Sequence, residues 1–185
     1  MSEVTISNSP VHSQSIITYP YGVPDSGYSC GWHTGIDFAP YGSTPANPIL
    51  YSVVTVEVVQ VVTSTSGALG VQALILSSDN EYWRYCHMVE GSLQVAVGDL
   101  VTTASPIGQM GATGNVTGIH LHLERATSYA WTCNTFLNPA TYLNIPNEDN
   151  TIVNYDPAPV PPTPSYTRKT HFPWAVFTHK IRERR

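Results

Sequence analysis

The segment from Gly118 to Glu124 (GIHLHLE) places two histidines one residue apart within a mainly aliphatic stretch. Side chains alternate along a β-strand, so His120, His122 and Glu124 are expected on one face and the two leucines on the other. The leucines can then enter a core while the imidazoles face a groove. Three interpretations are open: both histidines bind a metal ion, one binds it while the other acts on a substrate, or both lie on the surface of an edge strand.

A second pair of candidate ligands lies far upstream in the sequence. His33 and Asp37 are four residues apart around Gly35, in the segment HTGID. Imidazole and carboxylate groups are both good zinc ligands, with bonds of about 2.0–2.2 Å. Glycine lets the backbone bend or approach another segment closely, so both side chains could turn toward one ion. Taken alone, the pair also fits an ordinary loop.

His87 is a third candidate, and it follows an aromatic strand. A period of two predicts that Trp83, Tyr85 and His87 share one face, which also fits a histidine packed against aromatic rings. A catalytic zinc site has three protein ligands and one open position, whereas a structural site has four protein ligands. The upstream His-Asp pair and one histidine of the H-x-H pair would supply three ligands, leaving two histidines for hydrolysis.

Together these motifs resemble those of the lysostaphin-type zinc metallopeptidases, which cleave peptidoglycan cross-links. That family combines an H-x-x-x-D element, a histidine after an aromatic strand, and a late H-x-H strand behind a glycine-rich turn. The order and approximate spacing of all three match over residues 30–125. The last motif, GATGNVTGIHLHLE, is long and specific.

The resemblance implies one zinc ion with a bound water, held by three ligands: His33, Asp37 and His122. It implies two catalytic histidines, without deciding which is the general base: His87 and His120. The chain has no H-E-x-x-H motif, so the glutamate-base scheme of that metalloprotease class does not apply. We expect Glu124 to be structural and to orient a ligand from outside the coordination sphere.

The composition, with 13 Gly and 15 Pro in 185 residues, favours strands and turns over long helices. We expect a mainly β fold: an antiparallel sheet core that forms an open groove with the zinc site, with long loops and little helix. Irregular structure is expected from residue 1 to about 30 and one helical turn at 139–143. Strands are predicted at 49–62, 71–77, 81–89, 93–97, 107–110 and 119–124.

The charge pattern divides the chain. Six of the eight Lys and Arg residues follow position 167 with one acidic residue, a net +5, whereas the rest carries two basic and twelve acidic residues, a net −10. We expect a metallopeptidase domain at 1–147, a polar and proline-rich linker at 148–164, and a basic, aromatic tail at 165–185. The positive charge of the tail would attract anionic wall polymers or membrane surfaces. The acidic body argues against binding to nucleic acid.

The three cysteines, Cys30, Cys86 and Cys133, are an odd number without a C-x-x-C motif, so we expect reduced thiols. No apolar run reaches the roughly 18–20 residues that span a membrane, and the N-terminus does not resemble a secretory signal. We therefore expect action at the bacterial cell wall after delivery by phage lysis machinery or as part of a virion.

The substrate is expected to be bacterial peptidoglycan, cut at a glycyl bridge or between D-alanine and a diamino acid. Three aromatic residues flank the first zinc element and could either line the groove or pack in the core and support the loops: Tyr28, Trp32 and Tyr41. The alternative function is a catalytically inactive wall-binding or structural virion module of the same fold. The complete set of histidine and aspartate residues favours the enzyme.

Overall fold

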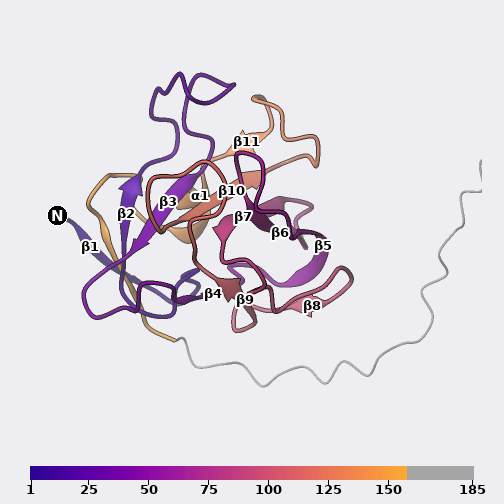
Figure 1. The fold of residues 1–185 in the computed structure, drawn as a ribbon. Coiled ribbons are helices and arrows are strands. Elements are labelled where there is room, and N and C mark those ends of the chain that lie inside the picture. Colours follow the sequence, from indigo (N-terminus) through magenta and orange to yellow (C-terminus); the bar gives the residue numbers. More distant parts are fainter. Residues whose placement is uncertain (158–185) are drawn as a thin grey trace, which may run out of the picture.

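The computed structural model describes residues 1–157, so the predicted tail at 165–185 lies outside the described residues. A ten-stranded sheet dominates this part of the chain, and the predicted mainly β fold is confirmed (Figure 1). The strands of this sheet are β1 (Glu3–Ile6), β2 (Ser15–Tyr19), β3 (Ile36–Pro40), β5 (Val56–Val62), β6 (Val71–Ser77), β7 (Tyr82–Met88), β8 (Leu100–Val101), β10 (Leu121–Ala126), β11 (Phe136–Leu137) and β12 (Ile152–Tyr155).

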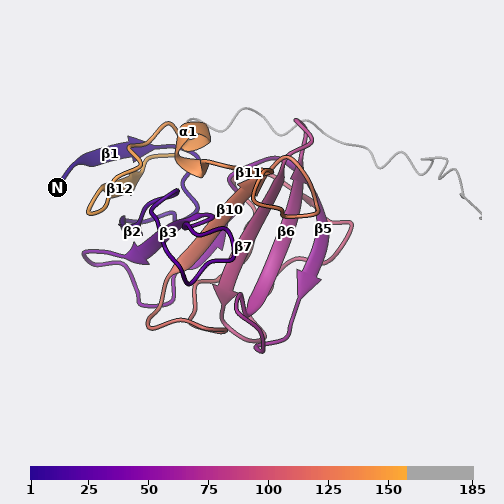
Figure 2. The same ribbon diagram turned by 90° about the horizontal axis from the view of Figure 1, so that it is seen from above.

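The strands follow the order β1-β12-β2-β3-β10-β7-β6-β5-β8, and β11 pairs with β10 off this path. All neighbours are antiparallel except β1 and β12, which run parallel. A second, two-stranded sheet joins β4 (Ile49–Tyr51) to β9 (Pro106–Gln109). Seen from above, β10, β7, β6 and β5 lie side by side, which puts the H-x-H strand well inside the sheet (Figure 2).

The core lies on the face of the sheet that receives the aliphatic side chains of β10 and the aromatic side chains of β7. Leu121, Leu123, Trp83 and Tyr85 are all fully buried there. The single helix among residues 1–157, α1 (Pro139–Leu143), packs Tyr142 edge-on against Trp83, with 4.9 Å between ring centroids. This apolar layer holds β7 and β10 in place, and the opposite face of these strands carries the polar residues of the candidate site.

Several regions differ from the predicted elements, and the strands β3, β8 and β11 were not predicted. The single strand expected at 49–62 is divided between β4 and β5, because residues 52–55 form a turn in which Ser52 Oγ donates to the Val54 carbonyl at 2.6 Å. The strand predicted at 93–97 is wrong: Leu93 and Val95 pack against the core without pairing in a ladder. The N-terminal 30 residues, expected to be irregular, contain β1 and β2.

The sheet continues beyond the boundary expected near Asn147. Strand β12, which the sequence placed in the linker, pairs with both β1 and β2. The Asn147 side chain itself is tied to the N-terminal region, since it donates to the Tyr21 carbonyl at 2.8 Å. Among residues 1–157, no helix has the length and apolar character needed to cross a bilayer.

A candidate metal centre in an open cleft

Three of the predicted ligands meet where β3 pairs with β10. Asp37 and His122 are direct register partners in this antiparallel pair, and His33 lies just before β3. Asp37 Oδ1 lies 2.8 Å from His122 Nδ1 and 3.2 Å from His33 Nε2, and the two nitrogens are 3.0 Å apart. Donor atoms around a tetrahedral zinc ion with bonds of about 2.0 Å are separated by roughly 3.3 Å. The three residues therefore fit one such ion.

Gly35 permits this convergence. A Cβ atom at this position would lie 2.6 Å from the Leu123 carbonyl oxygen and 2.8 Å from His122 Cε1. Any side chain would therefore push β10 away from the segment that carries His33. The close approach predicted for this glycine is confirmed.

Hydrogen bonds orient the ring of His33. Its Nδ1 lies 2.9 Å from the Pro20 carbonyl oxygen, and a carbonyl can only accept, so Nδ1–H is the donor. The lone pair of the neutral ring is then on Nε2, the atom that faces Asp37 and His122. A backbone carbonyl that fixes the tautomer in this way is typical of metal-binding histidines.

Glu124 approaches the other nitrogen of His122. Its Oε1 lies 3.2 Å from His122 Nε2; the contact is too poorly aligned for a hydrogen bond, yet the negative charge favours the proton on Nε2. Oε1 also accepts from Thr34 Oγ1 at 2.6 Å, and Oε2 accepts from Arg84 Nε at 2.5 Å. Burial would raise the pKa of Glu124, but His122, Arg84 and Thr34 outweigh it and lower the pKa to about 2.

The carboxylates of Asp37 and Glu124 lie on either side of His122 and determine its charge. Burial would raise the pKa of Asp37, but the neighbouring rings of His122 and His33 hold it well below its usual range. Burial would likewise lower the pKa of His122, but Asp37 and Glu124 raise it to about 9. A proton on His122 thus compensates the carboxylates, which is the electrostatic role that a metal ion would take.

His87 and His120 lie beside this cluster on its open side. Their ring centroids are 4.8 Å apart, and His120 Nε2 is 3.7 Å from Asp37 Oδ2. The Nδ1–H of His87 donates to the Thr113 carbonyl at 2.9 Å, and that of His120 to the Gly118 carbonyl at 3.0 Å. In the neutral form of either ring, Nε2 therefore carries the lone pair. Burial lowers the pKa of His87 to about 4, so it is neutral at pH 7.

The predicted face of His87 is wrong, and a β-bulge is the reason. Two residues of β7, Cys86 and His87, lie opposite the single residue Gln72 of β6, because the register passes from Val71↔Met88 to Ala73↔Tyr85. His87 also has a left-handed backbone, with φ of +62°. The extra residue turns His87 out of the core face, where Tyr85 remains, and into the cleft.

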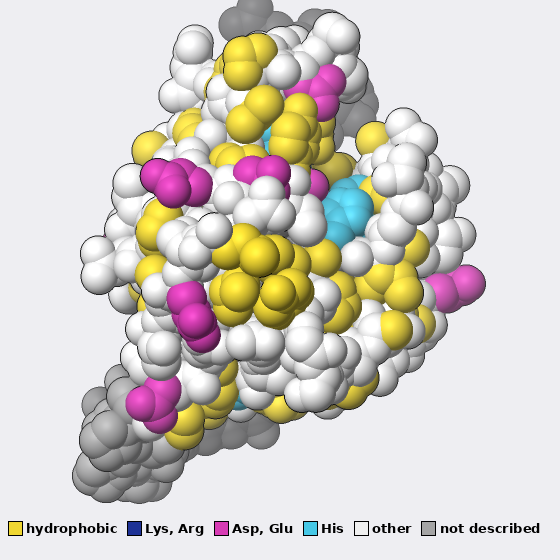
Figure 3. All heavy atoms as spheres, turned by 90° about the vertical axis from the view of Figure 1, so that its left-hand side faces the viewer, with side chains coloured by type: hydrophobic (Ala, Val, Ile, Leu, Met, Phe, Trp, Pro, Cys, Tyr) yellow, Lys and Arg dark blue, Asp and Glu magenta, His cyan; other side chains and the backbone are white. Residues whose placement is uncertain are grey.

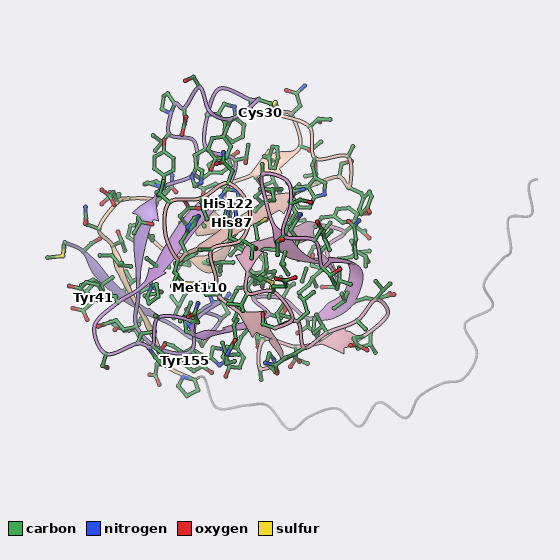
Figure 4. The ribbon with its side chains drawn as sticks, in the orientation of Figure 1. Cys30, Tyr41, His87, Met110, His122 and Tyr155 are labelled. Carbon is green, nitrogen blue, oxygen red and sulfur yellow. A yellow bond between two sulfur atoms is a disulfide. The ribbon has the colours of Figure 1, made fainter. Side chains whose placement is uncertain are left out.

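The cleft has a volume of about 590 Å³ and contains the candidate catalytic groups. Figure 4 shows His87 and His122 close together near the middle of the molecule, with Cys30 on the loop above them. Figure 3 shows histidine side chains reaching the surface in a hollow, beside acidic and hydrophobic side chains. The lining comes from four loops and the sheet, and includes Tyr28, Cys30, Thr34, Asp37, Leu69, Arg84, His87, Asn115, Thr117, His120, Glu124, Trp131 and Phe136.

Of the three aromatic residues expected near the groove, only Tyr28 lines the cleft. Trp32 packs edge-on against Phe136, with 5.9 Å between ring centroids, and so supports the wall from behind. Tyr41 lies far from the histidines (Figure 4). Sequence reasoning did not identify Trp131, which follows the last motif in a loop without a recognisable pattern.

The expected reduced state of all three cysteines is also wrong. Cys30 and Cys133 form a disulfide across a sequence separation of 103 residues, and Cys86 is a buried free thiol. The disulfide joins the loop before β3 to the loop after β10, and residues of both loops line the cleft. Widely spaced cysteines give no pairing signal in one sequence, so only the folded chain shows this link.

The sequence profile of Peptidase family M23 matches residues 31–132, which is more than half of the chain. The chain belongs to peptidase family M23. The matched range contains all five candidate histidine and aspartate residues, from His33 to His122. The resemblance seen in the sequence motifs is thereby confirmed.

Solved structures with a similar fold include peptidases. The catalytic domain of the antimicrobial peptidase lysostaphin from Staphylococcus simulans is 29% identical, with a TM-score of 0.56 over 69% of this chain and 91% of that chain. The catalytic domain of a prophage-encoded M23 protein, EnpA from Enterococcus faecalis, crystallised as a point mutant, is also 29% identical, with a TM-score of 0.55 and the same coverage. A zinc-containing peptidase from Vibrio cholerae is 28% identical, with a TM-score of 0.52 over 66% of this chain and 37% of that chain.

Proposed function

We propose that this M23 member is a zinc-dependent endopeptidase that hydrolyses peptide cross-links or stem peptides of bacterial peptidoglycan. The observation that carries the proposal is the convergence of three donor atoms within 3.2 Å of one another, beside two further histidines in an open cleft. The similarity to the catalytic domain of lysostaphin, an antimicrobial peptidase, supports the peptidase activity.

In this proposal His33 Nε2, Asp37 Oδ1 and His122 Nδ1 hold one zinc ion. When bound, zinc lowers the pKa of a coordinated water to about 7 and polarises the scissile carbonyl. The proposal would leave a fourth position for water, because three ligand atoms are brought together while the ring of His120 is held by the Gly118 carbonyl, with its Nε2 3.7 Å from Asp37 Oδ2. This arrangement supports a catalytic site and argues against a closed structural one.

His87 and His120 would carry the proton transfers. A neutral imidazole with its lone pair on Nε2 can accept a proton from the attacking water, and its conjugate acid can then donate that proton to the leaving amine. The low pKa of His87 keeps its ring neutral at pH 7, with the lone pair available, but makes it a weak base unless the bound substrate raises its pKa. The second histidine would then stabilise the oxyanion of the tetrahedral intermediate.

How the protein reaches the bacterial cell wall does not follow from the zinc site. The similarity to the prophage-encoded protein EnpA supports delivery by a bacteriophage, either as a lysin or within a virion. The basic tail would add affinity for anionic wall polymers or membrane surfaces, a prediction that concerns residues outside the described part of the chain.

The test is amino-group release from purified sacculi, measured with the zinc-loaded protein, after chelation, and after zinc is restored. We expect release that is lost with chelator and recovered with zinc but not with magnesium. Asp37→Asn should abolish it. Asp79→Asn removes the same charge from an exposed turn and should leave it unchanged. Absence of release in every condition would instead favour a wall-binding or structural module.

A further inference from the structure

Arg84 is the basic side chain of the cleft. Residues 1–157 contain two Lys or Arg side chains, Arg84 and Arg125. Arg125 forms a bidentate pair with Glu81, with nitrogen–oxygen distances of 2.6 and 2.7 Å, and does not line the cleft. Arg84 projects from β7 opposite Glu124 of β10, its register partner, and does line it.

The guanidinium of Arg84 is held rigidly but is not saturated. Its Nε and one terminal nitrogen contact Glu124 Oε2, and its Cζ lies 4.0 Å from the centroid of the Trp131 ring. A guanidinium has five N–H groups, and Nη1 has no hydrogen-bond partner among residues 1–157. The side chain is 14% exposed. The guanidinium therefore offers ordered N–H donors toward the cleft. Binding a ligand to them would cost little further side-chain entropy.

The backbone of Trp131 supports a dedicated role for this arrangement. Trp131 adopts a left-handed conformation, with φ of +48°, which is uncommon for a bulky residue. Such strain persists only where the surroundings hold it, and it clusters at ligand sites. Here the loop that carries Trp131 is tied by the Cys133–Cys30 disulfide, so the indole stays stacked on Arg84.

The charges of the occupied site favour an anionic substrate group. With a zinc ion bound (+2), the carboxylates of Asp37 and Glu124 (−2) and the guanidinium of Arg84 (+1) give these groups a net charge of +1, although Arg84 is paired with Glu124. This count rests on the proposed zinc function. In a partly buried cleft with this net positive charge, the remaining N–H groups of Arg84 can bind a carboxylate through charge-assisted hydrogen bonds.

The strand spacing sets where that carboxylate would lie along the substrate. Glu124, level with Arg84, is two residues along β10 from the ligand His122, which is about 6.8 Å at the usual rise of an antiparallel strand. An extended peptide advances by a similar distance in two residues. We propose that Arg84 is a specificity-determining residue that binds a carboxylate of the peptide substrate about two residues from the scissile bond.

The test uses internal competition between carboxylates and carboxamides. Peptidoglycan fragments are partly amidated with carbodiimide and ammonia, digested with the zinc-loaded protein, and the cut and uncut species are compared by mass spectrometry. Wild type should cut fragments with the free carboxylate with about tenfold or greater preference in kcat/KM, as expected for a hydrogen bond between charged groups. The preference should depend on one carboxylate near the cut bond.

Variants separate this role from a structural one. Arg84→Gln should reduce the preference to within about twofold and raise KM, while zinc content stays at one ion per chain. Arg84→Lys keeps a charge beside Glu124 if the glutamine variant fails to fold, and it should lose most of the preference because it lacks the planar fork. Arg125→Gln is the matched control and should keep the preference.

The outcomes are distinguishable. If wild type cuts both forms equally, or if Arg84→Lys and Arg84→Gln retain the full preference, the Arg84 inference is overturned while the peptidase function stands. If the zinc-loaded wild type cuts neither form and releases no amino groups from intact sacculi, the proposed function fails and the inference falls with it.

Discussion

Replacing Glu124 with glutamine should weaken zinc binding by about 10- to 100-fold, although residue 124 is not a proposed ligand. Its carboxylate lies 3.2 Å from His122 Nε2, so it favours the tautomer with the lone pair on Nδ1. The pKa of about 2 means that this group is ionised at pH 7. Glutamine keeps the shape and removes the charge. The expected loss corresponds to about 1.4–2.7 kcal/mol of binding free energy.

The assay is competition for zinc with a chromophoric chelator at pH 7, with folding followed by circular dichroism. Glu81→Gln is the matched control, because it makes the same change in the Arg125–Glu81 pair, outside the cleft. It should bind zinc like wild type. The reasoning is refuted if folded Glu124→Gln binds zinc within twofold of wild type, since the charge beside Nε2 would then have no influence on His122.

Three further predictions concern the scaffold. Gly35→Ala should cost about 1–3 kcal/mol of unfolding free energy and most of the zinc affinity, because its Cβ would meet the Leu123 carbonyl at 2.6 Å; urea titration without loss of stability would contradict this. Reducing the Cys30–Cys133 bond should lower the unfolding free energy by roughly 2–5 kcal/mol, and a Cys-to-Ser double variant should match the reduced protein. Burial lowers the pKa of His12, stacked between two tyrosine rings, from 6.5 to about 4. This depressed pKa adds stability above pH 6.5 that is lost as the pH falls through 4, and His12→Phe should remove that part of the pH dependence.

The site was predictable where side-chain alternation decides the outcome. On β10 the leucines enter the core and the polar residues face the cleft, because a strand with one buried face allows a single register. Gly35 was predictable for a similar reason, since a glycine between two candidate ligands indicates a close approach. The ligand assignment came from the family resemblance, and the donor geometry supports it.

The remaining features depend on contacts between distant segments. The bulge that turns His87 into the cleft arises from the register of β6 against β7, which a local pattern cannot specify. Strand β12 is short, and its pairing partner β1 lies about 150 residues earlier. At Leu93 and Val95 a strand was predicted where none forms. Both side chains pack against the core, which gives the sequence the alternating pattern of a strand, but the backbone does not pair with a neighbouring strand.

An open zinc site with separate binding and catalytic histidines predicts that zinc content and activity respond differently to replacement of His122 and of His120. Zinc content and amino-group release from sacculi are determined on the same preparations of wild type, His122→Ala and His120→Ala. We predict one zinc ion and activity in wild type, loss of both in His122→Ala, and retained zinc without activity in His120→Ala. Full zinc content and full activity in His122→Ala would contradict the account.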